Sequence, residues 1–310
     1  MRNGQHIAVI TGATSGIGKA FACEYAKRGF DLIITGRRRE ELAQVADTLT
    51  KNYKVKIQIF LGDLGDPDKR KALCLLVQQA GEVDVLINNA GFGIDRAFDE
   101  NEISEIRAMI GTHVLTTSEL THIVLKGMMT RREGTIINVS SLGAFTPGLT
   151  RSMYFATKSY IHYFTEALYM EVHSYGIKVQ SLCPGLTLSD FHRNLDNPGL
   201  EKKLSVMKFT SPGEVVSESM KTLKKGSLLC IPGTLNKLFY FLSKCIPLRI
   251  MMKLAEFRNK PVDVRRTGYI CNTGENMQTG IVIPMFGSKI FSDMQRSLNV
   301  NQSLKYSSVH

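Results

Sequence analysis

The chain has 310 residues, of which 43% are hydrophobic and 22% charged, fractions typical of a globular protein with a large buried core. No run of 18 apolar residues occurs, and the N-terminal residues lack the apolar core of a signal peptide, so we expect neither an ordinary membrane span nor secretion. The six cysteines show no Cys-x-x-Cys pair and no zinc spacing. We therefore predict reduced thiols in a cytoplasmic protein without a metal site.

The net charge of +11 is unevenly distributed along the chain. Residues 1–200 are almost balanced, whereas residues 201–260 contribute +8. Such a local excess is either a solvated lysine-rich surface or a docking surface for an acidic partner, such as anionic lipid or a phosphorylated acyl carrier. We predict no nucleic-acid binding, because no aromatic residues interleave the basic ones in the pattern of a single-strand platform and no binding motif is present.

Apolar runs alternate with helical patterns from the first residues onward. Strands are predicted at residues 6–11, 31–35, 55–61, 83–88, 134–139 and 178–183. Helices are predicted at residues 15–28, 38–51, 67–80, 103–129 and 152–174. This alternation predicts an α/β fold of the Rossmann type, a doubly wound parallel sheet with helices on both faces.

The pattern suggests three parts: a nucleotide-binding catalytic domain over residues 1–230, an apolar and basic helical segment over 231–260, and a C-terminal extension over 261–310 that is partly loose. In the second part, one helical face carries Leu235, Leu238, Phe239, Leu242 and Ile246. Pro247 then interrupts the helix, and a second short helix is predicted from residue 248 to 257. The segment fits a lid, a membrane-surface element, a subunit interface or simple packing on the core.

Residues Thr11–Gly18 follow the first strand and begin the first helix. Glycines at this place allow a tight turn and a close approach of backbone to a pyrophosphate, which then sits at the helix N-terminus. The second strand ends in Gly36 followed by three arginines, where an acidic residue would bind the ribose of NAD. We predict NADP(H), with Arg37 on the 2′-phosphate, while Arg38 and Arg39 fit equally well the start of a solvent-facing helix.

Tyr154 and Lys158 lie four residues apart on a predicted helix and therefore share a face. An ammonium group beside a phenol favours phenolate, so we expect a Tyr154 pKa below the usual value of about 10. Ser141 lies at the end of the preceding strand, where its hydroxyl can polarise a carbonyl group. Together with a nucleotide loop that can supply hydride, these residues indicate a carbonyl–alcohol oxidoreductase.

With these motifs, residues 5–190 resemble the short-chain dehydrogenase/reductase family. Asp63-Leu64 is similar to the family's adenine contact, Asn88–Gly91 to the run that closes strand four against the cofactor, and Pro184-Gly185 to the loop around the nicotinamide. Spacing to Tyr154 selects Ser141 over Ser140 as the catalytic serine. The resemblance implies a cofactor site formed by Gly12, Thr14, Ser15, Gly16, Ile17, Gly18, Arg37, Asp63, Leu64, Asn89, Ala90, Gly91, Tyr154, Lys158, Pro184, Gly185, Thr187 and Ser189.

The chain departs from the family pattern at His113, which stands where the family has a catalytic Asn. In the family this Asn holds a helix kink and a water that links the catalytic Lys to solvent. The backbone carbonyl of His113 can serve much of that role, and its imidazole could join a proton relay because its pKa is ordinarily near neutrality. Alternatively, His113 is a tolerated replacement that points elsewhere.

Several runs, among them Tyr154–Tyr160 and Gly176–Leu182, are similar to a family branch with 3-oxoacyl-CoA reductases and hydroxysteroid dehydrogenase-like proteins. This resemblance implies reduction of a small apolar ketone or acyl thioester by Ser141, Tyr154 and Lys158, with His113 as the fourth site residue. It also implies a homodimer or homotetramer built on the two long helices, with peripheral membrane contact as an option. The alternative is a catalytically weak NADP-binding sensor or scaffold.

Overall fold

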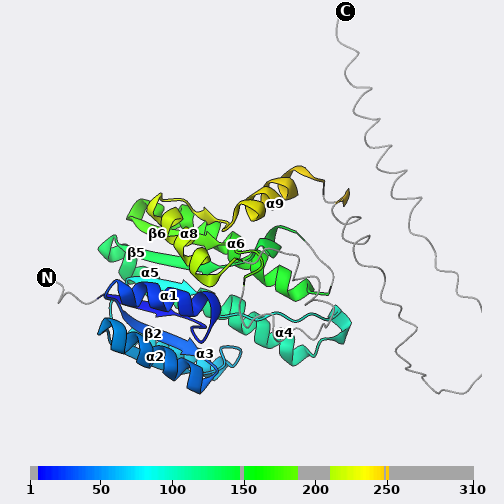
Figure 1. Ribbon diagram of the computed structural model, residues 1–310. Coiled ribbons are helices and arrows are strands. Elements are labelled where there is room, and N and C mark those ends of the chain that lie inside the picture. The colour runs from blue at the N-terminus through cyan, green and yellow to red at the C-terminus, as the bar shows by residue number, and fades with distance from the viewer. Residues whose placement is uncertain (1–5, 147–149, 188–209, 248, 251–310) are drawn as a thin grey trace, which may run out of the picture. The chain divides into compact units, whose positions relative to one another are not determined.

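The computed structural model describes residues 6–146, 150–187, 210–247 and 249–250. Within these residues, seven strands form one parallel sheet in the order β3-β2-β1-β4-β5-β6-β7 (Figure 1). The strands are β1 (Ile7–Ile10), β2 (Asp31–Gly36), β3 (Ile57–Leu61), β4 (Val85–Asn88), β5 (Gly134–Val139), β6 (Ile177–Leu182) and β7 (Leu229–Cys230). The predicted Rossmann-type sheet is confirmed.

Helices cover both faces of the sheet (Figure 1). One face packs against α1 (Gly16–Lys27), α2 (Arg39–Tyr53) and α8 (Pro212–Lys224); the other packs against α3 (Pro67–Gln79), α5 (Thr116–Arg131) and α6 (Ser152–Val172). Because neighbouring residues of a strand point to opposite faces, Ala8 and Ile10 join the first apolar layer and Val9 joins the second. Both faces are buried, which explains the continuous apolar runs of the strands.

The helix predicted over residues 103–129 contains a π-helical turn. It comprises α4 (Ile103–Ile110), the π turn η2 (Gly111–Leu115) and α5, and the Thr116 hydroxyl donates to the Gly111 carbonyl at 3.0 Å across the turn. A π turn inserts one residue into the helical repeat and is common at functional sites. It is therefore notable that His113 lies in the middle of η2.

Two described elements, α8 and β7, were not predicted from the sequence. Helix α8 has a capping box in which the Ser211 hydroxyl accepts from the Glu214 N–H and the Glu214 carboxylate accepts from the Ser211 N–H, with Pro212 at the first helical position. A Ser followed by Pro and, three residues later, Glu is a helix-start pattern that can be recognised in the sequence. Strand β7 has only two residues and cannot be recognised by periodicity.

The helix predicted before Pro247 is confirmed as α9 (Thr234–Cys245), whereas nearly all of the second predicted helix lies outside the described residues. Short 3₁₀ turns are formed by η1 (Phe98–Glu100), η3 (Leu142–Phe145) and η4 (His173–Tyr175). The chain divides into two units, Met1–Val262 and Asp263–His310, and every described residue belongs to the first. The predicted division at residues 230 and 260 stays a prediction.

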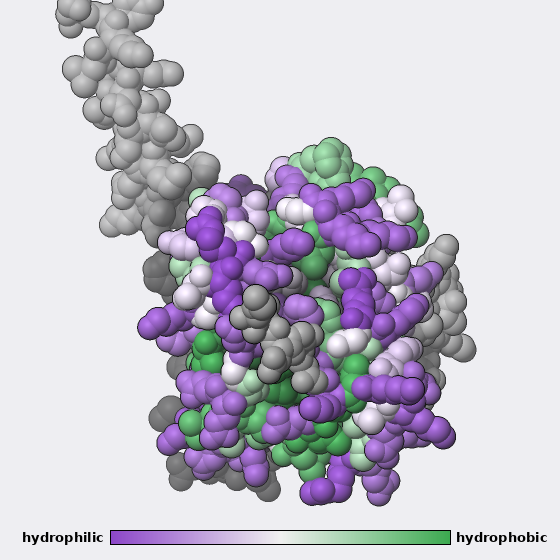
Figure 2. Space-filling view, turned by 90° about the vertical axis from the view of Figure 1, so that its left-hand side faces the viewer, coloured by the Kyte–Doolittle hydropathy of each residue, from purple (hydrophilic) through white to green (hydrophobic). Residues whose placement is uncertain are grey.

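Figure 2 views the molecule from the left-hand side of Figure 1, and hydrophilic side chains predominate among the described residues on that face. Among the described helices, none combines the length and the hydropathy required to cross a bilayer.

Candidate active site

The glycine loop between β1 and α1 is held in a shape that side chains would obstruct. Gly12 has a φ of +70°, and a Cβ atom there would lie 2.8 Å from the Ala90 Cα. A Cβ atom on Gly18 would lie 2.2 Å from the Gly12 carbonyl oxygen. The Asn89 amide donates to the carbonyls of Thr11 and Gly12, each at 2.9 Å, and so ties the loop to the end of β4.

The start of α1 fits a phosphate group. Ser15 is the N-cap residue, and its hydroxyl makes no capping hydrogen bond to the described residues. The first N–H groups of the helix, from Gly16, Ile17 and Gly18, therefore keep their donor capacity for an anion placed on the helix axis. Together with the approach that Gly12 permits, this leaves room and donors for a pyrophosphate, and the role of residues 11–18 stays a prediction.

The predicted adenosine-side residues lie near one another at the ends of β2 and β3. The Arg37 Nη1 and Asp63 Oδ2 atoms are 3.5 Å apart, and both side chains are about half exposed. Leu64 is buried. Arg38, which the sequence left as a possible helix start, donates from Nη2 to the Thr14 hydroxyl at 3.1 Å. The Arg38 guanidinium thus lies beside the glycine loop, and the Arg37 guanidinium lies beside Asp63 and over the Phe92 ring. Guanidinium groups at this place are donors suited to a ribose phosphate.

Residues 89–91 connect the glycine loop with the end of β4. The backbone N–H groups of Asn89 and Ala90 both donate to the Thr11 hydroxyl at 2.9 Å. Gly91 lies against His113, because a Cβ atom at Gly91 would approach His113 Nε2 to 2.8 Å. Thr11 was part of the predicted loop Thr11–Gly18, but no role was predicted for its hydroxyl.

The structure separates the roles of the two serines after β5. The Ser141 hydroxyl accepts from the Gly143 N–H at 3.0 Å, and the Ser141 side chain acts on Tyr154 by opposing the rise of its pKa. Ser140 is buried, and its hydroxyl donates to the Lys158 backbone carbonyl at 2.7 Å. Ser140 thus fixes α6 to the sheet, Ser141 acts on Tyr154, and the catalytic role predicted for Ser141 stays a prediction.

The electrostatics of Tyr154 and Lys158 differ from the expectation. The Lys158 ammonium donates to the Val139 carbonyl at 2.8 Å and lies 5.9 Å from the Tyr154 ring centroid. Burial raises the pKa of Tyr154, against the opposing effects of the Ser141 hydrogen bond and the Arg151 charge. Burial also lowers the pKa of Lys158 to about 8. The expected depression of the Tyr154 pKa is thus wrong for this state, because desolvation dominates.

His113 is fully buried between the β4 loop and α6. Its Nε2 atom accepts from the Phe92 N–H at 3.0 Å, so the proton of the neutral ring is on Nδ1, which lies 2.8 Å from the Thr157 hydroxyl. That hydroxyl donates onward to the Tyr154 carbonyl at 3.0 Å. Burial, aided by the Lys158 charge, holds the His113 pKa well below its usual range. Both ring nitrogens are engaged, which favours a positioning role over a proton relay.

Beneath the site lies a buried amide network that was not predicted. Asn88 Nδ2 donates to Asn138 Oδ1 at 2.8 Å, and Asn138 Nδ2 donates to the Thr165 hydroxyl at 3.0 Å. All three side chains are buried. The network joins the ends of β4 and β5 to α6 and thereby positions Asn89 and Ser141. The sequence did offer a signal for this network, because Asn88 and Asn138 each stand at the end of an apolar strand.

The Pro184-Gly185 loop follows β6 and contacts α9. A Cβ atom on Gly185 would lie 2.6 Å from the Asn236 Oδ1, so α9 packs directly on this loop. The Thr187 hydroxyl donates to the Gly185 carbonyl at 3.2 Å. Ser189 lies outside the described residues. The contribution of Asn236 was not foreseen, because residues 231–260 were considered only for their apolar and basic character.

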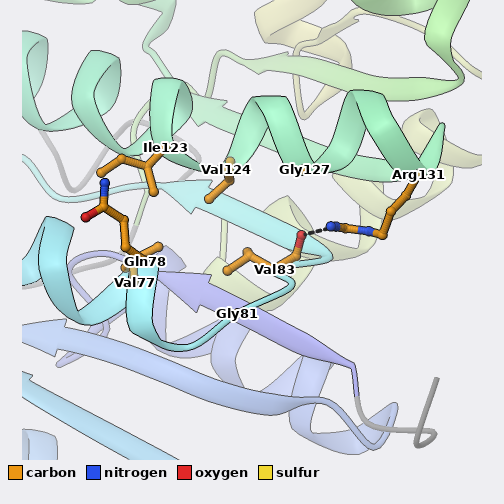
Figure 3. A pocket seen from close by; sticks show the side chains of 8 residues that line it. All are labelled: Val77, Gln78, Gly81, Val83, Ile123, Val124, Gly127 and Arg131. Carbon is orange, nitrogen blue, oxygen red and sulfur yellow. Dashed lines mark hydrogen bonds between the residues drawn. The ribbon is translucent and has the colours of Figure 1, made fainter.

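A hollow of about 150 Å³ lies elsewhere, between α3 and α5 (Figure 3). Its lining includes Val83, which precedes β4, and the Arg131 guanidinium donates to the Val83 carbonyl at 2.8 Å. Since Asn89 follows β4, the hollow and the candidate active site lie at opposite ends of the sheet. None of the predicted site residues lines this hollow.

Comparisons with known proteins agree with this geometry. Residues 6–198 match the family model of the short chain dehydrogenases. The chain is 35% identical over 181 residues to a very-long-chain 3-oxoacyl-CoA reductase of Anas platyrhynchos, covering 57% of this chain and 58% of that protein. It is 34% identical over 182 residues to the inactive hydroxysteroid dehydrogenase-like protein 1 of Homo sapiens, covering 57% of this chain and 54% of that protein.

A solved structure of L-sorbose reductase from Gluconobacter frateurii, complexed with NADPH and L-sorbose, is also similar. It superimposes with a TM-score of 0.64 at 27% identity, over 74% of this chain and 97% of that one. The chain spans little more than half the length of the two curated relatives. Because the family match covers most of the described sheet and its helices, the chain belongs to the short-chain dehydrogenase family of oxidoreductases.

Proposed function

We propose that the protein is an NADP(H)-dependent reductase that converts an apolar, lipid-like ketone or a 3-oxoacyl thioester to a secondary alcohol. One observation carries the proposal. The Ser141 side chain acts on the Tyr154 phenol by opposing the rise of its pKa, and the Lys158 ammonium lies 5.9 Å from the phenol ring centroid, where β5 ends next to the nucleotide loop. Paired hydroxyl donors at one point suit a carbonyl oxygen that becomes negative during reduction.

The proposed chemistry assigns one task to each side chain. NADPH, when bound, supplies hydride to the carbonyl carbon. Ser141 and Tyr154 donate hydrogen bonds to the carbonyl oxygen, and Tyr154 then transfers its proton as general acid. The raised pKa of Tyr154 keeps the phenol protonated at neutral pH, which is the form required for reduction. Lys158 holds the ribose hydroxyls, and His113 with Thr157 holds the Tyr154 backbone.

The preference for NADP(H) rests on the two arginines after β2. Arg37 is more than half exposed and Arg38 contacts Thr14 of the glycine loop, so two guanidinium groups follow β2, where an acidic residue would bind the ribose of NAD. Asp63, the nearby acid, is already within ion-pair distance of Arg37. The solved relative that binds NADPH agrees with this assignment.

The substrate class is proposed from the relatives and from α9. One relative is named a very-long-chain 3-oxoacyl-CoA reductase, which suits an apolar substrate. Helix α9 packs on Gly185, next to the loop proposed for the nicotinamide. If residues 231–260 assist substrate binding, deleting them raises KM for long-chain ketones more than for short ones, and equal losses would exclude this role.

The experiment is NADPH oxidation by the purified protein against ketones that range from short 3-oxoacyl thioesters to long-chain and steroid-like compounds. We expect turnover that rises with substrate length and is greater with NADPH than with NADH. Tyr154→Phe abolishes it, whereas Tyr163→Phe, an exposed tyrosine on the same helix, leaves it unchanged. Turnover that survives in the Tyr154 variant would refute the assigned mechanism.

A second candidate function is a catalytically weak NADP-binding sensor or scaffold. Two observations favour keeping it: His113 stands at the family's Asn position, and one relative is named inactive. Tight NADPH binding without turnover on any ketone would support it, and restoration of turnover by His113→Asn would identify the cause. A sensor keeps NADPH binding and its biological effect in the Tyr154→Phe variant, whereas a reductase loses its effect.

A further inference from the structure

Helix α9 is turned with its apolar face outward. Between 44% and 69% of each of five large apolar side chains on this face is exposed: Leu235, Leu238, Phe239, Phe241 and Leu242. On a soluble amphipathic helix this stripe would face the core. We call these five side chains the α9 apolar face.

The opposite side of α9, which is polar, contacts the rest of the molecule. Asn236 packs on Gly185 and donates to the Pro232 carbonyl. The Tyr240 ring meets the Phe145 ring edge-on, with their centroids 4.6 Å apart. These residues fall on the helix side away from Leu238, so packing on the catalytic loops is what turns the apolar face outward. In this arrangement the α9 apolar face points away from Gly185 and Phe145.

Basic side chains border the α9 apolar face. Lys237 pairs with Glu218 of α8, and Lys244 lies 5.5 Å from the Phe145 ring centroid while its side chain stays exposed. Arg249 is exposed beyond the helix. Residues 201–260 contribute +8 of the net charge of +11. Apolar side chains flanked by lysine and arginine are the composition of a helix that lies in a membrane interface.

We propose that the α9 apolar face docks on a lipid surface that contains anionic headgroups. The five apolar side chains enter the boundary between headgroups and acyl chains, and the basic border binds the headgroups. A second copy of the chain is a poorer occupant, because a two-fold interface over this face would bring the same basic residues of both copies together. The proposal goes beyond the proposed reductase function and does not depend on turnover.

Docking through α9 would place the catalytic loops beside the bilayer. Asn236 contacts Gly185, and Tyr240 contacts Phe145 in the turn that follows Ser141. An apolar substrate dissolved in the bilayer could then reach the site without crossing water. This consequence depends on the proposed function, whereas lipid binding itself does not.

The test is co-sedimentation of the full chain with vesicles of phosphatidylcholine, alone or mixed with phosphatidylglycerol. Binding is expected to be stronger to the mixed vesicles and to weaken as salt is added. The double variant Leu238→Ser/Phe241→Ser lowers vesicle affinity by about tenfold or more. The matched control Leu75→Ser/Phe98→Ser removes the same residue types from other exposed positions, 49% and 56% exposed, and keeps the affinity.

NADPH binding, measured on each variant, shows whether the fold is intact. The proposal is overturned if the unaltered chain binds neither kind of vesicle, or if both double variants lose affinity equally. It is also overturned if the α9 variant dissociates an oligomer and the unaltered chain does not bind lipid, which would assign the face to a second copy. Absence of ketone reduction, with vesicle binding intact, would affect the proposed function only.

Discussion

The Nδ1 atom of His113 and the Oγ1 atom of Thr157 are 2.8 Å apart, and this hydrogen bond joins the π turn η2 to α6. The donors run in one direction, from the Phe92 N–H to His113, from His113 to Thr157, and from Thr157 to the Tyr154 carbonyl. The imidazole therefore spans two backbone segments that a shorter asparagine side chain would reach only in part.

The first prediction concerns the coupling of His113 and Thr157. His113→Asn can still accept from the Phe92 N–H but is too short for Thr157, so Thr157→Ala should destabilise the natural chain by about 1–2 kcal/mol more than it destabilises the His113→Asn variant. Urea unfolding of the natural chain, the two single variants and the double variant measures this difference. Strictly additive effects would show that the two side chains do not act together.

The second prediction concerns the pH dependence that His113 confers. In the unfolded chain His113 takes up a proton near pH 6.5, whereas its folded pKa is well below that value because of burial and the Lys158 charge. The unfolded state therefore binds more protons as the pH falls below about 6.5, and the free energy of unfolding decreases. His113→Asn should show a shallower acid decrease. A His113 ring NMR signal that titrates near neutral pH would instead support the relay.

The third prediction is that Lys158→Met abolishes turnover and yet stabilises the fold. Burial lowers the Lys158 pKa to about 8, so its charge is destabilising at neutral pH. Replacement should raise the free energy of unfolding by roughly 1–2 kcal/mol after the loss of the Val139 hydrogen bond.

The rise in the free energy of unfolding caused by Lys158→Met should depend on pH, and this dependence is the control for the third prediction. Between about pH 8 and the unfolded lysine pKa of about 10.4, the unfolded state of the natural chain holds more protons, so its stability rises with pH. The difference in the free energy of unfolding between Lys158→Met and the natural chain should therefore be largest below about pH 8 and decrease above that pH. A gain that is equal at pH values of about 7 and 9.5 would have another origin.

The fourth prediction addresses cofactor choice. Arg37→Ser should weaken NADPH binding by about tenfold while NADH binding changes little, because only NADPH carries the 2′-phosphate. Arg39→Ser removes the same charge from the first residue of α2 and is the matched control. Fluorescence titration with both cofactors gives the four affinities. Equal effects of the two variants would indicate a general electrostatic contribution.

The fifth prediction compares two glycines. Gly18→Ala would bring a Cβ atom to 2.2 Å from the Gly12 carbonyl oxygen, so we expect destabilisation of about 1–3 kcal/mol and weaker cofactor binding. Gly213, in the first turn of α8, has open space around it. Gly213→Ala should therefore stabilise the fold by about 0.4–1 kcal/mol. Thermal unfolding of both variants tests the contrast.

The sequence predicted most of the sheet because buried parallel strands are continuous apolar runs. The family resemblance and the spacing to Tyr154 favoured Ser141 over Ser140, and that choice stays a prediction. The π turn around His113 was not predicted from the helical pattern, although the family resemblance associated this position with a helix kink. The Tyr154 pKa was assigned the wrong direction because local spacing reveals the neighbouring Lys158 but not the desolvation of both groups.

Helix α9 illustrates a different limit. Its periodicity correctly grouped Leu235, Leu238 and Leu242 on one face, but a pattern does not reveal which way a face points. That direction is set by contacts distant in sequence, between Tyr240 and Phe145 and between Asn236 and Gly185.

The strand order β3-β2-β1-β4-β5-β6-β7 has a consequence for how the chain folds as it is synthesised. After β1, β2 and β3 have emerged from the ribosome, one edge of β1 stays open until Val85–Asn88 is made. From then on each new strand adds to the strand made before it. The residues of the glycine loop are thus synthesised first, Ser141, Tyr154 and Lys158 next, and α9 last among the described elements.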